Sequence, residues 1–127
     1  MYQKFLVIEL IEEGQRLLEA LARKRFSVKA AMWHYFTESE VWTLVIVSPA
    51  VDRLGTLAAY TRVQSVLAST NPSTLTLLDI ALVSPRDKEY HGLRIEDISP
   101  DRIRVGPAPQ RIVLQNDYLY GSQRPHA

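Results

Sequence analysis

Asp79 is the carboxylate with the most unusual surroundings in this sequence. It interrupts the nearly continuous apolar run of residues 74–83, which predicts a buried strand. A carboxylate at such a position needs hydrogen bonds or a nearby cation, because burial without them disfavours its charged form. Together with Asp52 and His34, or with Glu38, it could bind a metal ion or act as a general base. In this interpretation the chain is a metal-dependent hydrolase or nuclease.

The same residues also have a purely structural interpretation. Asp79 could be held by an arginine or by backbone amides, or lie exposed at a sheet edge. His34, on an otherwise apolar strand face, could be a neutral imidazole hydrogen-bonded to the Thr43 hydroxyl. The strand around Asp79 also lacks the acidic-x-Lys triplet that metal-dependent nucleases often carry. These observations favour a protein that is not an enzyme.

The sequence contains none of the sharp catalytic motifs. There is no glycine-rich phosphate loop, no H-E-x-x-H and no G-x-S-x-G, and the three histidines are too scattered to suggest a ligand set. The absence of cysteine excludes zinc ribbons, thiol nucleophiles and disulfide scaffolds. We therefore predict no metal and no cofactor.

A basic stripe near the C-terminus suggests a third class of function. Arg102, Arg104 and Arg111 fall on predicted strands, with Tyr118 and Tyr120 close by. Basic and aromatic side chains on a sheet are what single-stranded nucleic acid requires, for phosphate pairing and base stacking. Solvated strand faces have the same composition, and the net charge is only +1. Nucleic-acid binding is therefore the least favoured of the three hypotheses.

Length and composition predict one small domain. The chain has 127 residues, of which 46% are hydrophobic and 23% are charged, and domains commonly contain about 100–150 residues. We expect a single domain over residues 1–120 and a flexible tail over 121–127. No apolar stretch approaches the ~20 residues needed to span a bilayer, so we expect a cytoplasmic protein with no membrane association.

The pattern of apolar residues predicts an α+β fold in the order α-β-β-α-β-(short α)-β-β. The sheet should be mainly antiparallel, with two helices packed on one face. Three- and four-residue spacing indicates helices, whereas β-branched and aromatic runs indicate strands. The expected elements are helices over 2–25 and 52–69 (the second capped by Asp52), a short helix over 84–93, and strands over 28–36, 41–47, 74–83, 102–105 and 111–114.

The two central strands form a hairpin that is apolar on both faces. With Phe36 opposite Val41, one face carries a set of large residues: Trp33, Tyr35, Trp42, Leu44 and Ile46. Two helices can cover only one face of the sheet, and monomers rarely leave a large apolar patch in water. If the helices cover the opposite face, the aromatic face must bind a partner. The leading hypothesis is therefore a non-enzymatic interaction or regulatory module, a homodimer or a binder of another protein, that associates through this aromatic face.

One segment of the chain resembles known proteins. The run from Phe26 to Trp33, with Ser39, Trp42, Leu44, Ser48-Pro49, Val51-Asp52, Gly55, Ala59 and Tyr60, is similar to a family of small uncharacterised bacterial proteins. The resemblance covers about residues 8–63. It implies a free-standing bacterial domain, and it supplies neither a substrate nor catalytic residues because the family has no known activity.

Overall fold

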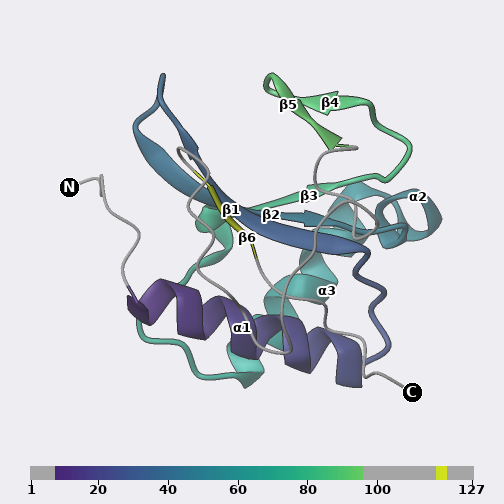
Figure 1. Cartoon of the computed structure of the whole chain (residues 1–127). Helices are drawn as coiled ribbons and strands as arrows, with labels where there is room; N and C mark the ends of the chain where they lie inside the picture. Colours follow the sequence, from purple (N-terminus) through teal and green to yellow (C-terminus); the bar gives the residue numbers. More distant parts are fainter. Residues whose placement is uncertain (1–7, 96–116, 120–127) are drawn as a thin grey trace, which may run out of the picture.

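The computed structural model describes residues 8–95 and the backbone of residues 117–119 (Figure 1). Its elements follow the predicted order α-β-β-α-β. They are α1 (Ile8–Arg23), β1 (Ala30–Phe36), β2 (Val41–Val47), α2 (Ala50–Leu54), α3 (Thr56–Ser69), the 3-10 turn η1 (Leu77–Asp79), β3 (Ile80–Val83), β4 (Glu89–Tyr90), β5 (Leu93–Arg94) and β6 (Asp117–Leu119).

The main sheet has the strand order β3-β2-β1-β6. β1 runs antiparallel to both β2 and β6, and Phe36 stands opposite Val41 as predicted. β2 and β3 are parallel. A parallel pair needs a crossover connection, which α2 and α3 supply here. The sheet is therefore mixed.

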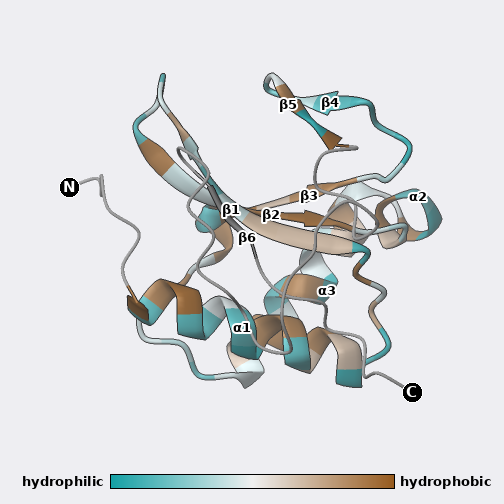
Figure 2. Ribbon diagram, viewed as in Figure 1, coloured by the Kyte–Doolittle hydropathy of each residue, from teal (hydrophilic) through white to brown (hydrophobic). Residues whose placement is uncertain are grey.

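Helices α1 and α3 pack on one face of this sheet, as predicted (Figure 1). Apolar side chains of α1 are buried along its inner side. Hydrophobic and hydrophilic residues alternate along the ribbon of this helix (Figure 2). The buried side chains of α1 meet the apolar side chains of α3 and of the sheet in one cluster whose fully buried members include Leu17, Leu21, Trp33, Leu44, Ile46 and Val63. This cluster is the main core of the chain.

The helices cover the aromatic face of the hairpin, and this corrects the proposed interface. Trp33, Leu44 and Ile46 are fully buried within the chain. Trp42 is half-buried and packs against the same cluster, and its ring centroid lies 5.4 Å from that of Tyr35. The interface hypothesis depended on the helices covering the opposite face. The error arose because both faces are apolar, so the hydrophobic pattern did not distinguish which one the helices cover.

The opposite face of the sheet is covered by the β4–β5 hairpin (Figure 1). Its buried cluster is formed by Met32, Val45, Val47, Val83 and Ile95, with Phe36, Tyr90 and Leu93 packed against it. A short helix was expected over residues 84–93, and this prediction was wrong. His91 and Gly92 both have positive φ, 48° and 83°, which suits the two-residue turn of a hairpin and is incompatible with a helix.

Two further element boundaries differ from the prediction. The helix expected over residues 52–69 is divided at Gly55, whose φ of 90° ends α2 and begins α3. Asp52 therefore lies inside α2 and is not a helix cap. The strand expected over residues 74–83 is confined to β3, because residues 74–76 form a loop and residues 77–79 form η1. The predicted strands over 102–105 and 111–114 and the predicted tail lie outside the described residues.

Candidate functional site

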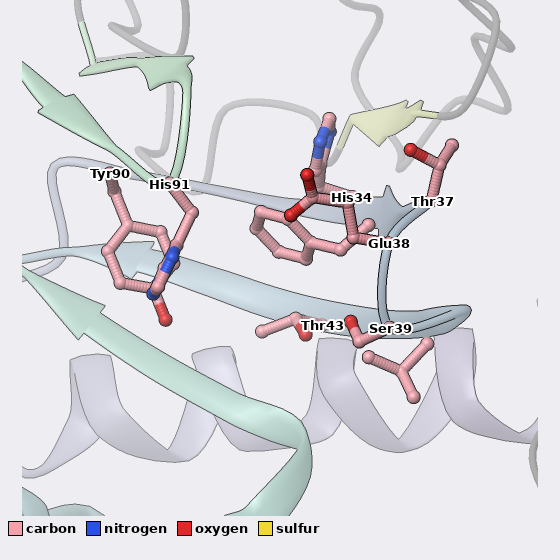
Figure 3. A pocket seen from close by; sticks show the side chains of 9 residues that line it. His34, Thr37, Glu38, Ser39, Thr43, Tyr90 and His91 are labelled. Carbon is pink, nitrogen blue, oxygen red and sulfur yellow. The ribbon is translucent and has the colours of Figure 1, made fainter.

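A groove opens between the tip of the β1–β2 hairpin and the turn of the β4–β5 hairpin, with a volume of about 520 Å³ (Figure 3). Nine described residues line it: His34, Phe36, Thr37, Glu38, Ser39, Val41, Thr43, Tyr90 and His91. They come from two hairpins that are separated by more than 40 positions in the sequence. The volume lies in the range of small-molecule sites, about 300–1,000 Å³.

Phe36 lies at the centre of the ring contacts in this groove. Its ring centroid is 4.5 Å from that of His34, and 6.0 Å from those of both Tyr90 and His91. All three contacts are edge-to-face, which is the arrangement that aromatic quadrupoles favour. Tyr90 and His91 also contact each other, with centroids 4.4 Å apart. These contacts tie the β4–β5 turn to the end of β1.

Both tips that border the groove contain a residue in the left-handed region. His91 has a φ of 48° in the β4–β5 turn, and Glu40 has a φ of 57° at the end of the β1–β2 loop. The amide of Glu40 donates a hydrogen bond of 2.7 Å to the carbonyl of Phe36, which closes that loop. Left-handed conformations cost a non-glycine residue free energy and are concentrated at functional sites. At position 91 this strained conformation places an imidazole at the groove.

The groove offers both polar and apolar surface to a ligand. Glu38 supplies a carboxylate, and Thr37, Ser39 and Thr43 supply hydroxyls beside the rings. Burial, together with the electrostatic influence of Tyr60, raises the pKa of Tyr90 above 10.0, so its phenol is a neutral hydrogen-bond donor at physiological pH. Within residues 8–95, no three His, Asp or Glu side chains come close enough together to hold a metal ion. With ring surface, a carboxylate and hydroxyls side by side, the groove has the composition of a site for an organic ligand.

The three residues proposed for a hydrolytic site do not converge. The Asp79 carboxylate accepts hydrogen bonds from the amide and the hydroxyl of Thr76, at 2.9 and 3.2 Å, and completes a capping box at η1. Asp52 accepts a 2.7 Å hydrogen bond from Ser84. The two carboxylates therefore lie at opposite ends of β3, roughly 15 Å apart at the rise of a strand. The expectation of Asp79 within a strand was wrong.

His34 is the one member of that trio that lines the groove. Thr43 stands opposite it in β2, as predicted, and both residues face the groove. The imidazole ring of His34 is half-buried against Phe36. The sequence did not indicate Tyr90 and His91, because they were assigned to a helix. Gly92 was the available signal for a turn, since glycine adopts positive φ readily.

The basic stripe predicted near the C-terminus lies outside the described residues, and so does the neighbouring Tyr120. Its members are Arg102, Arg104 and Arg111. Only the backbone of Tyr118 is described, in β6 opposite Trp33.

Sequence reasoning also missed Glu13, which is only 4% exposed on the inner side of α1. Its carboxylate accepts hydrogen bonds from the amide and hydroxyl of Ser73 and from the amides of Thr74 and Leu75, at 2.6–3.1 Å. Burial alone would raise its pKa, but these hydrogen bonds outweigh burial and lower the pKa from 4.5 to about 2. Each oxygen of the carboxylate accepts two of these hydrogen bonds, and all four donors belong to the loop before η1. Glu13 therefore joins α1 to that loop and has a structural role.

Comparisons with known proteins add no identification. The chain matches no family model, and neither the curated proteins nor the solved structures gave a match. No helix in the described part of the chain combines the length and apolar character required to cross a membrane.

Proposed function

We propose that this chain is a non-catalytic binding module that takes a small organic ligand into the groove between its two hairpins. The observation that carries the proposal is the convergence of Phe36, His34, Tyr90 and His91 from distant parts of the sequence around one hollow. A concave site with ring surface and a few polar groups is the usual form of a small-molecule site.

The strain at His91 supports a role in binding. Asparagine or glycine would adopt a φ of 48° more easily than histidine. The turn therefore carries a residue that is not the best choice for its backbone. An imidazole that contacts a ligand would account for this choice, because strained residues are often retained where they serve function.

This proposal keeps the non-enzymatic class of function that the sequence favoured, but it places the binding surface at the groove and not at the aromatic face. Trp33, Leu44 and Ile46 of the aromatic face are fully buried in the chain, so a dimer built on Trp33 has no accessible anchor. The hydrolase alternative is disfavoured, because Asp79 and Asp52 are each hydrogen-bonded to other groups at opposite ends of β3.

A fragment screen by ligand-observed NMR, followed by mapping on the protein, tests the proposal. His91→Asn removes the imidazole while retaining a residue that tolerates positive φ. Arg25→Asn is its matched control, since Arg25 also has a positive φ, 63°, and follows α1 near the far end of β1. Thr43→Val is a second groove variant that preserves side-chain volume.

Fragments that bind the wild type should weaken about fivefold or more in His91→Asn and Thr43→Val, the equivalent of about 1 kcal/mol. Their affinity for Arg25→Asn should be unchanged. The proposal fails if no fragment binds, or if those that do bind are indifferent to both groove variants.

A further inference from the structure

We infer that the ligand of this groove is a small organic cation, with an ammonium group held among the rings and the Glu38 carboxylate. The inference rests on the proposed function and adds the chemical class of the ligand. It follows from the charge, the ring surface and the size of the groove, which are independent observations.

The described lining of the groove favours positive charge. Glu38 is its only carboxylate among the nine described residues, and none of the nine is a lysine or an arginine. Apart from the two imidazoles, the formal charge of this described lining is negative. An anionic ligand would find no fixed positive charge there, whereas a cation would find one opposite charge and several oxygen acceptors.

The ring surface strengthens the same preference. Phe36 and Tyr90 both line the groove and are partly buried, and the faces of phenyl and phenol rings attract ammonium groups. Quaternary ammonium ions are commonly bound by several rings acting together, because they lack N–H donors and are only weakly hydrated. The ring cluster around Phe36 supplies such a surface beside the carboxylate of Glu38.

The size of the groove indicates a free small molecule. A volume of about 520 Å³ accommodates an ammonium group together with a body of several further heavy atoms. The hydroxyls of Thr43, which stands opposite His34, and of Ser39, which follows Glu38, also line the groove and are placed to bind polar atoms of that body (Figure 3).

Three probes of similar shape and different charge test the inference. They are choline, its neutral analogue 3,3-dimethylbutan-1-ol and the anion 3,3-dimethylbutanoate, each titrated into the protein while groove resonances are followed by NMR. Choline should bind about tenfold more tightly than the alcohol, the difference expected when ring faces and a carboxylate act together on a cation. The anion should bind most weakly.

One substitution and its matched control provide the remaining arm. Choline binding should weaken about fivefold in Glu38→Gln and stay unchanged in Glu12→Gln, which removes an exposed carboxylate from α1.

The outcomes separate this inference from the proposed function. Equal binding of choline and the alcohol, or tighter binding of the anion, would overturn the cation inference and leave the groove as a binding site. If none of the three probes binds while neutral or anionic fragments bind in the groove, the cation inference is also overturned. If no fragment binds either, the proposed function falls with it.

Discussion

Replacing Glu13 by glutamine should strongly destabilise the fold at neutral pH. The folded-state pKa of about 2, against an ordinary value of 4.5, corresponds to about 3 kcal/mol at 1.36 kcal/mol per unit. Because the pKa is lowered on folding, this stabilisation is fully present above pH 4.5 and is lost as the pH falls from there towards 2. Glutamine has no charge to stabilise, and its amide group would face backbone donors of the 73–75 loop.

Urea unfolding, followed by the fluorescence of the buried Trp33, measures this contribution. We expect Glu13→Gln to lower the free energy of unfolding by about 3 kcal/mol at neutral pH, and the difference from wild type to shrink steadily below pH 4.5. Glu12→Gln, at the exposed neighbouring position, should change stability by less than about 0.5 kcal/mol. A loss below about 1 kcal/mol for Glu13→Gln, or one that does not depend on pH, would refute the role assigned to these hydrogen bonds.

Two other substitutions test the packing of the sheet. Trp33→Asp should leave the chain largely unfolded by circular dichroism, because the cavity and the buried charge together destabilise the fold by more than about 4 kcal/mol. Leu57→Asp, at a position that is 81% exposed, should fold normally. A folded Trp33→Asp variant would contradict the assigned core. Tyr60→Phe removes the hydroxyl that accepts a 2.9 Å hydrogen bond from the Leu82 amide. It should cost about 1 kcal/mol and accelerate hydrogen exchange at Leu82, whereas unchanged exchange would contradict this contact.

The sequence predicted local structure well where periodicity and turn length acted together. The hairpin register, with Phe36 opposite Val41, followed from a four-residue polar loop between two apolar strands. The packing of α1 followed from its apolar stripe. The face on which the helices pack could not be predicted from the sequence, because both faces of the hairpin are apolar and hydrophobicity alone does not distinguish them.

The candidate site was harder to predict because its residues are brought together only by tertiary structure. His34 was identified, but its partners Tyr90 and His91 lie in a short hairpin whose two-residue strands have almost no periodicity. The importance of Asp79 was overestimated, since a local capping box satisfies its carboxylate within one turn. Glu13 was overlooked because its binding partners lie 60 or more positions away in the sequence.

Two-dimensional NMR mapping of choline on the intact chain tests the groove most directly. The account predicts saturable shifts confined to residues 34–43 and 90–91, the two hairpin segments that line the hollow. Shifts centred elsewhere, for example around Leu54 and Leu57 at the exposed junction of α2 and α3, would contradict the assignment of the groove as the ligand site.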